Sequence, residues 1–220
     1  MVNFLCSSIG KKLIMSLSGL FLLVFLALHA GLNACALVSR DLYGTVCAFM
    51  DTNPLVQLMV PALAGGFIVH ILFSLFVEFH NLTARPRAMQ YAVANKSKAT
   101  SWASKNMFVL GLIVLGFLAF HLCHFWAKMQ LQHWIGGEGQ NAYDLIVDLF
   151  SKWPFCVLYL VWFGAIYYHV SHGFWSAFQT IGLSNSLWIP RLQCLAKIYA
   201  VVIFLVYAAV PFCFLFGISS

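Results

Sequence analysis

Six of the eight histidines in the chain lie inside long apolar segments, where an ionisable side chain is costly. They are His29, His70, His121, His124, His169 and His172. An imidazole in such a segment faces the interior of a helix bundle and serves a function by default, because lipid cannot satisfy its ring nitrogens. Those nitrogens can ligate a metal ion or exchange a proton near neutral pH. The sequence therefore predicts a buried site built by histidines from separate segments.

The segments that must position these histidines are long enough to cross a membrane. The chain has 220 residues, of which 62% are hydrophobic and 8% charged, and its mean hydropathy of +0.89 excludes an ordinary soluble domain. A helix of about 20 apolar residues spans a hydrocarbon core of roughly 30 Å. We expect an all-α polytopic membrane protein that forms a single domain over residues 1–220. Its five expected transmembrane helices lie at residues 13–37, 56–79, 106–127, 154–177 and 195–217.

The distribution of charge predicts the orientation of these spans. With the N-terminus in the cytoplasm, nine of the 12 lysines and arginines fall on the inner side. Five of the six acidic residues then fall on the outer side, and only Glu78 lies at the inner edge. This arrangement is typical of membrane proteins, whose cytoplasmic loops carry the basic excess. Topology therefore explains the formal net charge of +6, and we expect a lipid bilayer but no nucleic acid as a partner.

Lys11 and Lys12 precede the first apolar segment and imitate the start of a secretory signal sequence. The segment runs for about 25 residues, however, whereas the apolar region of a signal sequence has about 7–15. More membrane spans follow it instead of an exported domain. We therefore keep it as the first span.

The seven cysteines are scattered, without a C-x-x-C pair or a cluster. This spacing indicates neither a disulfide framework nor an iron–sulfur or zinc site. The absence of C-x-x-C-H also indicates that any heme is held without covalent links to the chain.

Two of the buried histidines lie at nearly equal depth near the outer side. His29 lies 17 residues after Lys12, and His121 lies 16 residues after Lys105, on two spans that both run outward. At a rise of about 1.5 Å per residue, the difference in depth is only about 2 Å. The two imidazoles can therefore face each other across the bundle.

A second pair lies nearer the cytoplasm, on the two spans that run inward. His70 lies 8 residues before Glu78, and His169 lies 10 residues before Gln179. Iron in a b-type heme accepts one axial imidazole on each face of the macrocycle. We therefore predict two bis-histidine hemes, stacked across the membrane in a core of four helices. The span at 195–217 has no ionisable group at its centre, and we expect it to pack outside this core.

The two remaining buried histidines each follow a favoured ligand by three residues, on roughly the same face of the helix. His124 is the alternative to His121 as a ligand, and His172 follows His169. One member of each pair could bind iron while the other donates a hydrogen bond to a heme propionate or a quinone. We interpret His80 and His133, at span ends or in loops, as interfacial residues.

Three connecting segments complete this interpretation. Residues 39–57 are expected to form an outer loop in which Asp51 caps a turn before Pro54. Residues 80–105 form a basic cytoplasmic loop that offers a docking surface. In the second outer loop, the sequence LIVDLF predicts a short amphipathic helix at the membrane surface.

Five sequence segments together resemble a known family. They are SLSGLFLLVFLALH, FMDTNP, GGFIVH, HLCHFWAKMQ and HVSHGFWSAFQT, in family order. The resemblance, which covers nearly the whole chain, is to the single-chain, five-helix, di-heme cytochrome b membrane-anchor subunit of succinate:quinone oxidoreductases and quinol:fumarate reductases. It implies a subunit of the bacterial cytoplasmic membrane that carries electrons, in succinate oxidation or in fumarate reduction.

The resemblance also implies roles and partners. His29 and His121 would ligate the outer, distal heme, and His70 and His169 the inner, proximal heme. The chain has no flavin motif and no iron–sulfur cysteines, so succinate or fumarate chemistry would belong to a flavoprotein subunit and an iron–sulfur subunit on the cytoplasmic face. This chain would be the quinone-reactive subunit, using a menaquinone-type quinone near the outer face, in a complex that could also dimerise.

Quinone chemistry also requires protons, and an acid near the distal heme would supply or accept them. Asp51, just ahead of the second span, is the candidate for this proton transfer, although an Asp in DTNP also suits a turn cap. Arg40 and Trp126 are candidates for lining the same quinone pocket.

Two other functions compete with this one. A heme b anchor of a formate dehydrogenase, hydrogenase or nitrate reductase would pair its histidines differently and dock another soluble module. A proton-coupled transporter would use midplane histidines as a relay, but transporters of that kind have broken helices and internal repeats, and we see no convincing repeat here.

Overall fold

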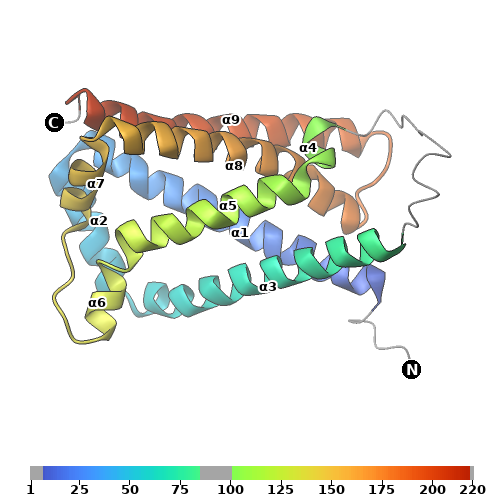
Figure 1. Ribbon diagram of the computed structural model, residues 1–220, viewed down its shortest axis with the longest axis horizontal. Helices are drawn as coiled ribbons and strands as arrows, with labels where there is room; N and C mark the ends of the chain where they lie inside the picture. The colour runs from blue at the N-terminus through green and yellow to red at the C-terminus, as the bar shows by residue number, and fades with distance from the viewer. Residues whose placement is uncertain (1–6, 85–100, 219–220) are drawn as a thin grey trace.

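The computed structural model describes residues 7–84 and 101–218, and all regular secondary structure in these ranges is helical (Figure 1). Five helices in them are long and apolar enough to cross a membrane, which confirms the all-α, polytopic class. They are α1 (Ser8–Val38), α3 (Pro54–Ala84), α5 (Met107–His121) continued by the π-helical turn η3 (Leu122–Trp126), α8 (Trp153–Thr180) and α9 (Trp188–Leu215). Each overlaps one predicted span, although α1 and α9 begin earlier than predicted.

The expectation of an outer loop over residues 39–57 is wrong. Most of this segment forms the helix α2 (Arg40–Thr52). Ser39 ends α1 and also caps α2, because its hydroxyl accepts a hydrogen bond from the backbone N–H of Leu42 at 3.1 Å. Asp41 lies in the first turn of α2, where a negative charge is favourable.

The cap at the start of α3 is also not the predicted one. The side-chain oxygen of Asn53 accepts hydrogen bonds from the backbone N–H groups of Leu55 at 3.0 Å and Val56 at 3.3 Å. Pro54 follows as the first helical residue, where its missing N–H costs nothing. Asp51, which we expected to cap a turn here, lies in the last turn of α2.

Shorter helices cover the ends of the bundle (Figure 1). α6 (Gln130–Trp134) and α7 (Ala142–Phe150) lie at the same end as α2, and α4 (Trp102–Lys105) lies at the other end. α7 is the amphipathic helix expected from LIVDLF. It buries its apolar face against the bundle and exposes Asp144 and Asp148.

Part of the predicted cytoplasmic loop is helical. α3 continues through Ala84, and α4 occupies the end of the segment. Most of the basic residues assigned to a docking surface, namely Arg85, Arg87, Lys96 and Lys98, lie outside the described residues.

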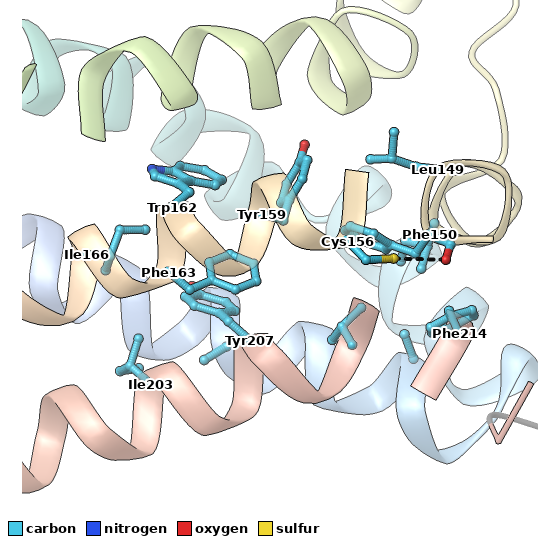
Figure 2. Close-up of a cluster of buried hydrophobic side chains, with 14 of the residues drawn as sticks. Leu149, Phe150, Cys156, Tyr159, Trp162, Phe163, Ile166, Ile203, Tyr207 and Phe214 are labelled. Carbon is cyan, nitrogen blue, oxygen red and sulfur yellow. Dashed lines mark hydrogen bonds between the residues drawn. The ribbon is translucent and has the colours of Figure 1, made fainter. Parts of the chain in front are cut away.

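The buried core lies along α8, α9 and α7 (Figure 2). α8 and α9 form the most extensive contact between two helices, and α1 packs against both of them and against α3. Large aromatic side chains fill the space between α8 and its neighbours, including Tyr159, Trp162, Phe163 and Tyr207. These contacts fix α8, which carries His169 and His172.

α9 lies beside α8 at one edge of the bundle and carries no histidine (Figure 1). It is nevertheless tied to α1 by two tyrosines. The hydroxyl of Tyr199 donates a hydrogen bond to the carbonyl of Leu23, and that of Tyr207 donates one to the carbonyl of Leu26 at 3.0 Å. A buried phenol needs such a partner in an apolar environment.

Candidate functional site

The structure brings four of the predicted ligands together as two pairs. The ring centroids of His29 on α1 and His121 at the end of α5 are 5.9 Å apart, with an angle of 82° between the ring planes. Those of His70 on α3 and His169 on α8 are 6.4 Å apart, at 75°. Each pair therefore joins two helices that are distant in sequence.

These separations suit a metal ion between the two rings. Two metal–nitrogen bonds of about 2 Å, with about 1 Å from each nitrogen to its ring centre, place the two ring centres roughly 6 Å apart. In the described ranges, no group of three or more His, Cys, Asp or Glu side chains could hold a metal ion alone. The pairs thus fit an ion whose remaining ligands come from a planar cofactor such as a porphyrin.

The ring of His70 is oriented by α1. Its Nδ1 atom lies 3.1 Å from the carbonyl oxygen of Met15 and 3.4 Å from the hydroxyl of Ser18. With Nδ1–H donating to that carbonyl, Nε2 keeps its lone pair for a metal. Gly19 permits this close approach, since a Cβ atom there would lie 3.1 Å from Cε1 of His70.

Unlike His70, the ligand candidates His121 and His169 have a ring nitrogen without a partner in the described part of the chain. The Nδ1 atom of each is buried and has no hydrogen-bond partner among the described residues. An unpaired buried polar atom is costly, and native proteins rarely keep one without a reason. Imidazoles in this condition are expected where a bound group completes their interactions.

Aromatic rings enclose the pair formed by His29 and His121. Phe25 stacks on His29 with a centroid separation of 5.4 Å, and Tyr207 lies 6.0 Å from the same ring. On the other side, the ring of Trp162 lies 5.5 Å from that of His121. A flat apolar cofactor would be well accommodated by such walls.

The π-helical turn η3 separates the roles of the two histidines in HLCHFW. His121 faces His29, whereas the Nδ1 atom of His124 lies 3.4 Å from the Tyr159 hydroxyl and its ring lies 4.0 Å from that of Phe120. Turns of this kind often occur at functional sites. The geometry favours His121 as the partner of His29.

His172, one turn after His169, has a buried Nδ1 atom with no partner among the described residues. Its ring lies 5.0 Å from that of Trp175. It is therefore available to a polar group of a bound ligand. His80 and His133 lie away from both pairs, near the ends of α3 and α6.

The candidates for a quinone pocket are not brought together. Arg40 forms an ion pair with Asp144 at 2.8 Å and lies over the ring of Tyr143, which ties α2 to α7. Trp126 packs against Trp134 with a centroid separation of 5.5 Å. Asp51 is exposed. In the part of the chain described, no hydrogen bond, ion pair or ring contact joins Arg40, Trp126 and Asp51 to one another.

The end of the bundle that carries α2 also holds two ionisable groups that the sequence did not single out, the buried Tyr43 and the half-buried Cys47. Burial raises the pKa of the Tyr43 phenol, and the neighbouring Cys47 thiol raises it further. Burial likewise raises the pKa of Cys47. Both groups therefore stay neutral at physiological pH and contribute to packing rather than to charge.

The sequence did not predict the contacts that three residues make near the proposed ligands: Ser18, Trp162 and Tyr207. A polar group inside a span was the available signal, because such a group needs a partner. The partner of each depends on how the helices rotate about their axes, which the spacing of residues alone does not give.

Fold and site together define a class: a polytopic helical membrane protein with two pairs of facing histidines in its bundle. Comparison with known proteins narrows this class of protein further. Over 182 residues, or 82% of each chain, this chain is 25% identical to the succinate dehydrogenase cytochrome b558 subunit of Bacillus subtilis (strain 168). This distant similarity supports a relationship to the cytochrome b membrane subunits of succinate dehydrogenases. No family model and no solved structure matches the chain.

Proposed function

We propose that the chain is the membrane anchor and electron-transfer subunit of a succinate dehydrogenase or fumarate reductase. It would hold two b hemes and carry electrons between an iron–sulfur subunit and a menaquinone-type quinone. The observation that carries this proposal is the geometry of the two histidine pairs, at 5.9 Å and 6.4 Å, in a chain similar to a cytochrome b subunit.

In this proposal, the four histidines act as axial ligands. His29 and His121 would ligate the distal heme iron, and His70 and His169 the proximal heme iron. Heme iron supplies one-electron chemistry when bound. The chain contributes fixed imidazole positions, apolar walls that exclude water, and the Met15 carbonyl, which holds the ring of His70 in one orientation.

The soluble partners would bind at the inner end, on the cytoplasmic face. Succinate or fumarate chemistry needs a flavin and iron–sulfur clusters, and the sequence has no motif for either. The basic excess on the inner side favours an acidic partner surface. Within the described residues, Arg191 contributes to this basic excess, and its guanidinium lies over the ring of Trp188, 5.7 Å from the ring centroid.

The quinone would react near the outer pair. Asp51 remains our candidate for proton transfer there, since it is exposed at the outer end of the bundle and its carboxylate is open to solvent. Arg40 and Trp126 would line the pocket only if they leave their present partners, Asp144 and Trp134. His172 would act as a hydrogen-bond donor near the proximal heme.

A reduced-minus-oxidised absorbance spectrum of the purified complex, with a heme titration, tests the proposal. We expect two b hemes per chain and succinate-driven reduction of a dye by the co-purified subunits. A colourless protein would contradict the proposal and favour a proton-coupled transporter. Heme without succinate-driven reduction would favour the anchor of a formate dehydrogenase, hydrogenase or nitrate reductase.

The assignment of ligands is tested by His169→Ala, with His133→Ala as the matched control. Loss of one axial ligand should abolish the proximal heme and leave the distal heme partly assembled. His133 lies outside both pairs, so its replacement should leave both hemes in place. Full occupancy of both hemes in the His169→Ala protein would reject the assignment.

A further inference from the structure

Trp162 carries a buried polar group that no described residue satisfies. Its side chain is 7% exposed, and its indole Nε1 atom has no hydrogen-bond partner among the described residues. Leaving a buried donor unpaired is costly, and most buried donors in native proteins have a partner. The indole N–H therefore points to an acceptor that these residues do not supply.

The position of this N–H relates it to one histidine pair. The Trp162 ring lies 5.5 Å from the ring of His121 and stacks on Phe117 with a centroid separation of 6.0 Å and an angle of 16°. Figure 2 shows Trp162 and Tyr159 on the side of α8 that faces away from α9. Trp162 thus contributes to the wall of the site that contains His121, on the α5 side of α8.

None of the described neighbours of the indole accepts its hydrogen bond. Phe117 and Phe163 are apolar, the Tyr159 hydroxyl contacts His124 instead, and the Nδ1 atom of His121 has no hydrogen-bond partner in the described ranges. The indole N–H is a donor only, so its partner must be an acceptor. Such an acceptor must come from a molecule bound beside the outer histidine pair.

We infer that the indole N–H of Trp162 donates a hydrogen bond to an acceptor oxygen of the ligand bound at His29 and His121. This inference rests on the proposed function. Two ligands of that site carry acceptor oxygens: a heme, through a propionate carboxylate, and a quinone, through a ring carbonyl. Trp162 is in either case a binding residue rather than a packing residue alone.

The variant Trp162→Phe, made in the full chain within its complex, removes the N–H and keeps an aromatic ring against Phe117. Trp153→Phe is the matched control, because Trp153 lies on the same helix and is 67% exposed. Three quantities are measured for each protein: heme content, the midpoint potential of each heme, and the KM for a soluble quinone.

A propionate acceptor predicts a lower midpoint potential for the distal heme in Trp162→Phe, with the quinone KM unchanged. The N–H partly offsets the carboxylate charge, which otherwise favours ferric iron. A tenfold change in relative stability of the two oxidation states corresponds to about 59 mV for one electron, and we expect a shift of up to that size. The proximal heme should keep its potential.

If the acceptor is a quinone carbonyl, the quinone KM should change in Trp162→Phe and the heme potentials should not. The KM for the quinone should rise about tenfold, as expected for the loss of one hydrogen bond, and both heme potentials should stay unchanged. Unchanged potentials and an unchanged KM would overturn the inference. An absence of heme in the unmodified complex would instead reject the proposed function itself, so the two failures are distinguishable.

A second measurement does not depend on assembly of the variant. The ultraviolet resonance Raman band that reports indole N–H hydrogen bonding is compared in the unmodified full chain with heme and quinone, with heme alone, and with neither. A shift on binding of one of them supports the inference and identifies the acceptor. Identical bands in all three preparations would overturn it.

Discussion

The helices of the bundle differ in how tightly they are packed. α8 and α9 bury many side chains between them, including Phe163, Ile166, Ile203 and Tyr207. Among the described side chains of α3 none is buried, and in α5 only Leu110 is buried. Both helices nevertheless carry a predicted ligand.

Each histidine pair joins one tightly packed helix to one loosely packed helix. His29 on α1 faces His121 on α5, and His169 on α8 faces His70 on α3. α1 belongs with the packed group because it contacts α8 and α9 and accepts hydrogen bonds from both α9 tyrosines. The tightly packed helices α1, α8 and α9 therefore form the stable part of the bundle. A group bound between the imidazoles would hold α3 and α5 against them.

The largest expected effect separates the two histidines of η3. If the proposed ligation holds, His121→Ala should remove about half of the heme absorbance, because the iron between His29 and His121 would lose one axial ligand. His124→Ala removes contacts with Tyr159, Phe120 and Phe155 but none with His29, so both hemes should remain. Heme content of the two purified variants measures this directly. The reverse result would make His124 the ligand.

Removal of heme should affect the loosely packed helices more than the packed ones. A group that binds only the native state stabilises the elements it joins, and α3 and α5 have few other buried contacts. Hydrogen–deuterium exchange of protein expressed with and without a heme supply measures this. We expect faster exchange in α3 and α5 without heme and little change in α8 and α9. Equal changes in exchange in all helices would contradict the distinction between loosely and tightly packed helices.

A smaller effect is expected where α1 contacts the ring of His70. A Cβ atom at Gly19 would lie 3.1 Å from Cε1 of His70, so Gly19→Ala should displace that imidazole by a few tenths of an ångström. Gly31→Ala is the control, because nothing lies within 4 Å of its Cβ position on the same helix. Gly19→Ala should shift the midpoint potential of the proximal heme alone, measured by redox titration.

The smallest effect is expected on the surface of α7. The hydrogen bond from Lys152 to Asp148, at 2.8 Å, lowers the pKa of Asp148. Its stabilising contribution is therefore present at neutral pH and is lost as the pH falls through the lowered pKa. Asp148→Asn should slightly lower the thermal midpoint at pH 7, and the difference from the unmodified protein should vanish at acidic pH. A difference that persists in acid would show another cause.

Much of this architecture follows from the pattern of apolar residues. The five spans are long apolar segments, and the histidine pairs follow from counting residues to the polar ends of each span, since the rise per residue of a helix is fixed. Depth was therefore predictable. The pairing of His29 with His121 and of His70 with His169 needed only this quantity and the direction of each span.

What the sequence did not reveal depends on rotation and on local hydrogen bonding. The segment of α2 contains too few apolar residues in a row to predict a span, but Ser39 caps it as a helix. The environment of Trp162 and the bond from Tyr207 to α1 depend on how α8 and α9 turn about their axes. Residue counting gives no access to that angle.

The π-helical turn after His121 has a consequence for how the chain can change in length. A π-helical turn accommodates one more residue than the same stretch of α-helix. Because η3 begins at Leu122, directly after the ligand candidate, a residue can be gained or lost there without altering the register of α5. The segment that follows Trp126 can therefore change in length while His121 keeps its place opposite His29.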